Sequence, residues 1–320
     1  MIYLQNHQQQ LSGNKSLTNK RMSKDIKQLA IIGATASGKS DLAIQVAQDI
    51  DAYILSIDSL SIYKEIDIVS AKPSKDELAV VKHFGIDEIY PDEYFSVDIF
   101  IELYKKVILR CKKDAKNLVI VGGTSFYLKS LLDGLSPLPD ITDTTKITVQ
   151  KKLQNLQKCY EFLYNLDKVY MQKISPNDKY RIEKAMLIYE ASKLTPTKWF
   201  EHNKPKPIIK NLPIFNIDTN RDILRKRIEL RTSKMLKMGL IDEVCYLEHR
   251  YTRLPNAMSS IGIVEVLEYL DGKVTKDMML ENISIHTAQL AKRQQTFNKN
   301  QFNNITSASL EDLKKILSVY

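Results

Sequence analysis

Cysteine is scarce in this chain, which has three cysteines among 320 residues, all widely spaced. An odd, scattered set does not form the pairs of a disulfide framework or of a zinc site, so we expect a reducing, cytoplasmic environment. Long apolar runs are also missing, since none approaches the roughly 18 residues that a membrane span requires. These absences exclude a disulfide-stabilised secreted domain and argue against any membrane partner.

The N-terminal residues 1–25 lack the apolar stretch of a signal peptide. They are polar, they include three consecutive glutamines at positions 8–10, and Met22 offers a second translation start. Such a composition buries too little apolar surface to fold, and we therefore expect this segment to be a disordered tail.

Apolar and basic side chains are abundant: 43% of the residues are hydrophobic, and the formal net charge is +9. A chain of this length and composition buries a sizeable core, in one large domain plus a smaller unit. Its excess of positive charge favours a polyanionic partner, although many basic proteins have none.

The sequence GATASGKS, at residues 33–40, follows an apolar run at 29–32 and precedes a helical pattern at 42–50. Strand, glycine-bounded loop and helix are the context of the phosphate-binding loop (P-loop) G-x-x-x-x-G-K-S/T. The glycines permit a tight turn that directs N–H groups at an anion, and the helix N-terminus adds positive charge. Lys39 can then reach the outer phosphate, and the Ser40 hydroxyl can bind Mg²⁺. This stretch predicts binding of a phosphate chain.

A second apolar run, at residues 53–57, ends at Asp58. Strand, helix and strand in succession predict a parallel sheet, whose carboxyl ends meet at one edge. Asp58 is then expected on the same edge as the P-loop, where open sheets bind their ligands. The alternative is that Asp58 caps a short helix that begins near Ser59.

A third strand, at residues 118–121, is followed by Gly122, Gly123 and Thr124. An ATP-hydrolysing motor usually carries an acidic residue at this point to organise magnesium and water. Here the glycines allow close backbone approach to a ligand, and Thr124 can form hydrogen bonds but cannot serve as a base. This pattern weakens an NTP-hydrolase interpretation and leaves a kinase open.

Residues 140–207 have a helical period and many lysines, and the sequence KPKP at 204–207 marks their end. We interpret them as a helical insertion domain between strands of the sheet, because an apolar strand at 213–217 follows. The alternative is a helical cap whose lysines only face water.

Basic residues also recur in the C-terminal helices. Arg227 and Arg231 share one face of a helix at residues 221–238, where an arginine could neutralise a leaving phosphate. An ordinary surface helix is the rival interpretation. The last long helix ends in AKRQQTFNK, whose Lys292 and Arg293 lie near Phe297, a combination that suits a nucleic-acid backbone and a stacked base.

These segments predict an α/β fold with a P-loop three-layer α/β/α core, a parallel sheet and a helical insertion domain. We expect the core to comprise residues 26–139 and 208–305, with a C-terminal part that grips nucleic acid, and the insertion to comprise residues 140–207.

Several stretches together resemble the tRNA dimethylallyltransferases, which move an isoprenoid group onto an adenosine beside the anticodon. GATASGKS resembles the family's GPTASGKS, and DSLSIYK (58–64) resembles DS-x-x-V/I-Y-R/K. IDIVSAKP (66–73) is similar to MDIGTAKP, and VGGTSFYLKSLLDGLSPLP (121–139) is similar to VGGT-x-x-Y-x-x-ALLxGLxPLP. SPNDKYRIEKA (175–185) and AKRQQTF (291–297) resemble HPND-x-x-R-x-x-RA and AKRQxTW. The resemblance spans residues 28–299, with the motifs in the family's order.

The chain departs from these motifs at several positions, most of them in regions that the resemblance assigns to tRNA contact. Proline, glycine, threonine and arginine are replaced by Ala34, Val69, Ser70 and Lys184. Tryptophan, tyrosine and a basic residue are replaced by Phe297, Ile263 and Val264.

The resemblance implies roles for individual residues. Asp58 would be the general base on the adenine amine, Thr124 would lie at the reacting centre, and Arg231 would bind the departing diphosphate. The diphosphate loop would comprise Gly33, Ala34, Thr35, Ala36, Ser37, Gly38, Lys39 and Ser40, with Mg²⁺ at Ser40. Contacts with tRNA would come from Asp58, Ser59, Leu60, Ser61, Lys146, Tyr180, Arg181, Ile182, Glu183 and Lys184.

The implied activity is transfer of dimethylallyl from dimethylallyl diphosphate to adenosine 37 in the anticodon stem-loop of tRNA, by a monomer. Three alternatives remain: a small-molecule kinase, an isopentenyltransferase acting on free adenylate, and an RNA-binding module whose P-loop has lost its chemistry. The helical insertion and the AKRQ tail favour tRNA over a mononucleotide.

Overall fold

The structure is a computed structural model that describes residues 26–319. The predicted disordered tail, residues 1–25, lies outside the described residues. Within them, six parallel strands form one sheet in the order β3-β2-β4-β1-β5-β6. The strands are β1 (Gln28–Gly33), β2 (Ala52–Ser56), β3 (His83–Phe84), β4 (Asn117–Gly122), β5 (Ile214–Ile217) and β6 (Thr306–Ala308).

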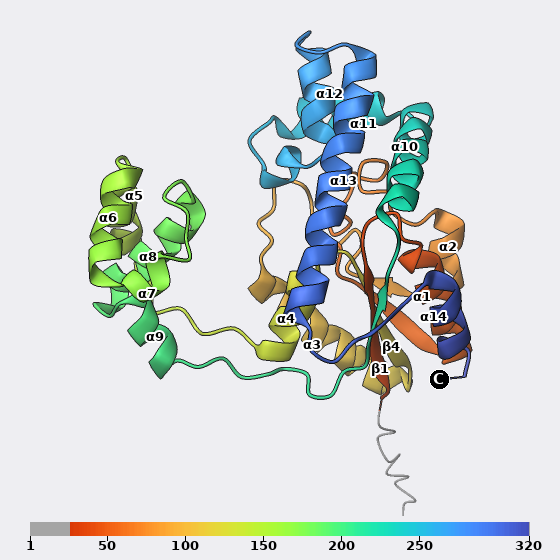
Figure 1. Cartoon of the computed structure of the whole chain (residues 1–320), viewed down its shortest axis with the longest axis horizontal. Coiled ribbons are helices and arrows are strands. Elements are labelled where there is room, and N and C mark those ends of the chain that lie inside the picture. The colour runs from red at the N-terminus through yellow and green to blue at the C-terminus, as the bar shows by residue number, and fades with distance from the viewer. Residues whose placement is uncertain (1–25, 320) are drawn as a thin grey trace, which may run out of the picture.

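The helices fall into two groups along the chain (Figure 1). Those around the sheet and above its edge are α1 (Lys39–Asp49), α2 (Lys75–Val80), α3 (Val97–Asp114), α4 (Ser125–Asp133), α10 (Arg221–Lys237), α11 (Leu240–Tyr251), the 3-10 helix η1 (Asn256–Ser259), α12 (Ile263–Leu270), α13 (Lys276–Gln301) and α14 (Leu310–Leu317). Those between β4 and β5 are α5 (Asp143–Lys152), α6 (Leu156–Leu166), α7 (Lys168–Met171), α8 (Lys179–Ser192) and α9 (Pro196–His202).

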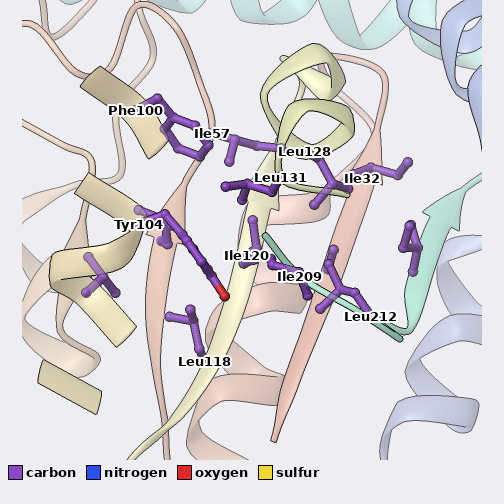
Figure 2. Packing of buried hydrophobic residues seen from close by; sticks show 14 of the residues in the cluster. Ile32, Ile57, Phe100, Tyr104, Leu118, Ile120, Leu128, Leu131, Ile209 and Leu212 are labelled. Carbon is purple, nitrogen blue, oxygen red and sulfur yellow. The ribbon is translucent and has the colours of Figure 1, made fainter. Parts of the chain in front are cut away.

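The sheet is apolar on both faces, which explains why its central strands read as continuous apolar runs. Ala30 and Ile32 of β1 pack toward α3 and α4, in the cluster that Figure 2 shows over β4. Leu29 and Ile31, which alternate with them, pack toward α1 and α14. Because successive side chains of a strand point to opposite faces, one run supplies both cores. The predicted α/β fold is confirmed.

The sheet continues beyond residue 305, where the predicted core ended. Strand β6 pairs with β5, and Leu313 and Leu317 of α14 are buried against the face that α1 covers. The sequence stretch at 306–308 is too short and too exposed for its pairing to be visible from periodicity alone.

A third apolar cluster lies above the carboxyl edge of the sheet. It joins α11, η1, α12 and the first half of α13 to the loop at residues 60–69. Val69 and Ile263, two of the departures from the family motifs, are buried together in it. These helices therefore anchor the loop that follows β2.

Helices α5–α9 form a unit whose hydrophobic cluster is built from α5–α8, with residues such as Leu163, Met171 and Ala185. They stand apart from the sheet in Figure 1 and are joined to it by two linkers. The linkers meet at Gly134, where an added Cβ would lie 2.1 Å from the Lys206 carbonyl oxygen. Among residues 26–319, no helix combines the length and apolar character needed to cross a membrane.

Candidate active site

A cavity of about 500 Å³ opens at the carboxyl edge of the sheet. Because β1, β2 and β4 are parallel, the segments that follow them all arrive at this edge. Helices α10 and α13, which pack against each other, close the opposite side. The lining includes Thr35, Asp58, Ser59, Leu60, Val69, Gly123, Thr124, Phe126, Ile228, Arg231, Met235, Leu240, Ile283, Leu290, Arg293, Gln294 and Phe297.

The P-loop forms a turn from β1 into α1. The Ser37 N–H donates to the Ala34 carbonyl, and Gly38 has the left-handed φ of 90° that lets the chain enter the helix. Gly38 is the N-cap and supplies no capping side chain, so the first N–H groups of α1 are available to an anion. The geometry is that expected of a phosphate-binding turn.

Asp58 is half-buried, two residues after the end of β2. Its Oδ1 accepts hydrogen bonds from the N–H groups of Leu60 (2.9 Å) and Ser61 (3.3 Å). Among the described residues Oδ2 accepts no hydrogen bond. One carboxylate oxygen thus orders the loop, and the other remains able to take a proton from a substrate in the cavity.

Asp58 reaches the site because β4 passes very close to it. A Cβ at Gly122 would lie 2.9 Å from the carbonyl carbon of Ile57 and 3.0 Å from the Asp58 nitrogen. Thr124 then accepts a hydrogen bond from the Ser59 N–H at 3.2 Å and donates to the Ser59 hydroxyl at 3.3 Å. The sequence pattern predicted that the two glycines admit a ligand, but Gly122 admits the backbone beside Asp58.

Two cations, Lys39 and Arg231, interact electrostatically with Asp58, and Arg231 lines the cavity with it. Desolvation by burial lowers the pKa of Lys39 to about 8; the Asp58 charge opposes this shift, and the Arg231 charge adds to it. Burial also lowers the pKa of Arg231, again opposed by Asp58. Arg231 Nη1 donates to the Thr35 hydroxyl at 3.1 Å, which places α10 directly against the P-loop. Partly desolvated cations of this kind favour an anionic ligand.

The loop that supplies Val69 to the cavity wall is held by the carboxylate of Glu243 and the buried ammonium of Lys72. Glu243 of α11 accepts from the backbone N–H groups of Asp67, Ile68 and Val69 at 2.7–3.1 Å. Lys72, whose side chain is 5% exposed, forms ion pairs with Asp67 and Asp87. The buried Lys72 charge is paired and Glu243 satisfies three backbone N–H groups, so these contacts order the wall without a ligand.

The predicted site residues divide into two groups. Asp58, Thr124 and Arg231 line one cavity with Thr35 and Arg293, whereas Lys146 and residues 180–184 belong to α5 and α8, away from it. Lys146 and Arg181 are exposed and form local ion pairs with Asp143 and Asp178; Lys292 of α13 is exposed as well.

The prediction that Ile182 contacts tRNA is wrong. Its side chain is fully buried among the helices of the α5–α9 unit, because it falls on the inner face of α8. Tyr180 and Arg181, its neighbours on that helix, are exposed.

Several lining residues were not predicted from the sequence. Gln294 accepts from the Thr35 N–H at 2.8 Å and donates to the Gly123 carbonyl at 3.1 Å. Phe126 is 50% exposed beside Thr124, and the segment from Ser259 to Gly262 closes part of the wall. The AKRQ motif contains Gln294, but nothing in its spacing indicates that the amide turns inward.

The residues present fit magnesium only together with a phosphate ligand. Among residues 26–319 there is no group of three acidic, histidine or cysteine side chains that could hold a metal by itself. Ser40 lies exposed in the first turn of α1, which suits an ion that takes one protein hydroxyl and fills its octahedron with phosphate oxygens and water.

Comparisons with known proteins agree with this architecture. Residues 61–301 match the family described as IPP transferase. A tRNA dimethylallyltransferase of Sulfurimonas denitrificans is 68% identical over 290 residues, which cover 91% of this chain and 98% of that protein. A tRNA dimethylallyltransferase of Sulfurovum sp. is 58% identical over 297 residues, which cover 92% of this chain and 99% of that protein.

Solved structures lead to the same family. The crystal structure of a full-length tRNA isopentenylpyrophosphate transferase from Bacillus halodurans aligns with a TM-score of 0.67 at 27% identity, over 92% of this chain and 94% of that one. A eukaryotic dimethylallyltransferase acting on tRNA shares the fold, with a TM-score of 0.76 at 22% identity. The match covers 89% of this chain and 75% of that one. The sheet with its cavity at the carboxyl edge is therefore a fold shared with these enzymes, and the chain belongs to the IPP transferase family.

Proposed function

We propose that this protein transfers the dimethylallyl group of dimethylallyl diphosphate to the exocyclic amine of adenosine 37 in tRNA, giving N6-isopentenyladenosine. The observation that carries the proposal is one cavity lined by Thr35 of the P-loop, the cation Arg231, the carboxylate of Asp58 and a set of apolar side chains. Membership of the IPP transferase family and relatives named tRNA dimethylallyltransferase support it.

The donor matches the two chemistries of the cavity. Its diphosphate would bind at the N-terminus of α1, with Lys39 and Arg231 neutralising its charge. Its five-carbon chain would pack against apolar side chains that line the same space, namely Val69, Ile228, Met235, Leu240, Ile283 and Leu290.

The reaction needs a base and a stabilised leaving group. The adenine N6 attacks C1 of the dimethylallyl chain, the C1–O bond breaks, diphosphate leaves, and the N6 proton passes to Asp58 Oδ2. A positioned carboxylate contributes a factor of ~10²–10⁴ to such a step. Lys39, Arg231 and the loop amides would stabilise the charge on the departing diphosphate. This stabilisation accelerates the reaction more than the base does, because the cavity is partly desolvated.

Magnesium would be held by Ser40 and the donor's phosphate oxygens. When bound, it supplies further positive charge to the leaving group.

The acceptor must reach the cavity from a folded anticodon arm. Adenosine 37 would therefore be flipped out of its stack, at a cost of a few kcal/mol. Arg293 at the cavity and Lys292 beside it on α13 would contact the RNA backbone, and exposed residues of α5–α9, including Lys146, Tyr180 and Arg181, would contact the arm at a distance from the chemistry. One chain supplies every group named here, so we infer that a monomer suffices.

The decisive test is mass spectrometry of nucleosides. The purified protein is incubated with magnesium, dimethylallyl diphosphate and bulk tRNA, the RNA is digested, and N6-isopentenyladenosine is measured. We expect it to form, and a transcript with guanosine at position 37 to remain unmodified.

Parallel arms decide between the alternatives. Replacing the tRNA by free adenylate tests an isopentenyltransferase that acts on mononucleotides, and supplying ATP without donor tests a kinase. Prenylated adenylate or consumed ATP, with the tRNA left intact, would contradict the proposal.

A further inference from the structure

Gln294 joins the two halves of the cavity floor. From α13 its Oε1 accepts a hydrogen bond from the Thr35 N–H of the P-loop at 2.8 Å. Its Nε2 donates to the Gly123 carbonyl at the end of β4, at 3.1 Å. The partners lie 259 and 171 residues away in the chain, so a single amide ties three distant segments together.

The Gln294 side chain occupies the space where a side chain of residue 123 would lie. A Cβ at Gly123 would lie 2.3 Å from Gln294 Nε2, well inside contact distance. Gly123 does not have a left-handed φ, so its backbone conformation is open to any residue. A methyl group at this position would therefore displace the glutamine amide from its present place.

Thr35 is fixed from two sides as a result. Gln294 Oε1 accepts a hydrogen bond from the Thr35 N–H, and Arg231 donates one to the Thr35 hydroxyl at 3.1 Å. Beneath it, Ala34 packs with Ile228 of α10 and Ala291 of α13. Since the Thr35 amide is already satisfied within the protein, the anion is left to the later amides of the loop and the start of α1.

We propose that Gln294 is a positioning residue that sets the P-loop against the end of β4 and so forms the diphosphate site. The proposal deepens the function given above, on which its link to prenyl transfer rests. It also places donor binding under the control of α13, whose adjacent Arg293 lines the cavity.

The test compares two neighbouring glutamines. Gln294→Ala should raise the KM of the diphosphate donor about tenfold, the effect of losing one to two hydrogen bonds, with the KM of tRNA unchanged. Gln295→Ala is the matched control, because Gln295 Nε2 donates at 2.9 Å to the Thr219 carbonyl and does not line the cavity. We expect the control to bind the donor as the wild type does.

A reciprocal substitution separates positioning from general structure. Gly123→Ala should lower both the melting temperature and the affinity for diphosphate, because the new methyl group displaces the amide. In the double variant Gly123→Ala/Gln294→Ala the clash is gone, so the melting temperature should return to that of Gln294→Ala, and diphosphate binding should stay as weak as in Gln294→Ala. Such non-additivity is expected only of groups in contact.

Affinity is measured by calorimetry with inorganic diphosphate and magnesium, without tRNA or prenyl donor. An unchanged diphosphate affinity in Gln294→Ala, or a rise in the tRNA KM alone, would overturn the proposal, and so would destabilisation of the double variant by the sum of the single effects. If the wild type fails to prenylate tRNA while Gln294→Ala still weakens diphosphate binding, the proposed function fails and the positioning role stands.

Discussion

The cavity edge and the α5–α9 unit use their charged residues in opposite ways. At the cavity, contacts join distant parts of the chain: Arg231 and Thr35 are 196 residues apart, and Thr35 and Gln294 are 259 apart. In α5–α9, exposed cations pair with acids of the same unit, either three residues away, as in Lys146 with Asp143 and Arg181 with Asp178, or on a neighbouring helix, as in Lys152 with Glu190.

The difference lies in solvation. Charges at the cavity are partly removed from water, where each interaction is strong and a lost partner is costly. Exposed pairs on helices contribute little, are screened by salt, and exchange partners readily. This difference supports the proposals that the cavity binds a small anion and that the α5–α9 unit contacts a polyanion, which would replace its local acids.

The largest expected effect tests the cavity. Asp58→Asn keeps an oxygen that can accept from the Leu60 and Ser61 N–H groups but removes the base. We expect kcat for prenyl transfer to fall by ~10²–10⁴, because proton removal from the amine is lost. The measurement is single-turnover prenylation of tRNA.

Asp58→Ala serves as the comparison, since it also removes the hydrogen bonds that order the loop. It should lose at least as much activity and, in addition, some stability. Wild-type turnover in Asp58→Asn would remove Asp58 from the role of base and erase the contrast between the two regions.

An intermediate effect is expected in α5–α9. Lys146→Ala/Arg181→Ala should raise the KM of tRNA about tenfold and leave the donor KM unchanged, because under the proposal each cation binds phosphate and takes no part in the chemistry. The slope of log affinity for tRNA against log salt concentration should decrease in magnitude by about one to two.

Lys193→Ala is the control, because Lys193 is an exposed lysine of the same unit, paired with Glu190 in the same i,i+3 manner. We expect its tRNA KM to stay near the wild-type value. Equal effects from Lys193 and from the tested pair would mean that the unit contributes only diffuse charge.

The smallest effect concerns pH. Burial lowers the pKa of Lys39 to about 8, so the free enzyme carries this charge below pH 8 and loses it above. Diphosphate prefers the charged lysine, and kcat/KM for the donor should therefore fall several-fold as pH rises through about 8, whereas kcat should hold to higher pH.

Lys39→Arg keeps its charge throughout this range and should flatten the profile of kcat/KM. An inflection near pH 8 that persists in Lys39→Arg would assign it to another group and would weaken the view of Lys39 as a desolvated cation.

Much of the site follows from local rules. The P-loop, the acid after β2 and the threonine after β4 each follow an apolar strand, and parallel strands bring their carboxyl ends to one edge. The α/β fold was predictable for the same reason. Local rules did not reveal that Ile182 faces inward, because the apolar pattern of α8 does not single out one face.

The sequence by itself determined the α/β fold, the P-loop and the acid that faces it, because periodicity and turn chemistry are properties of neighbouring residues. The tertiary structure alone decided that Arg231 reaches Thr35, that Gly122 and Gly123 accommodate protein rather than ligand, and that Gln294 completes the floor. These contacts depend on how α10 and α13 pack over the sheet, and packing between segments 150 or more residues apart leaves no local trace in the chain.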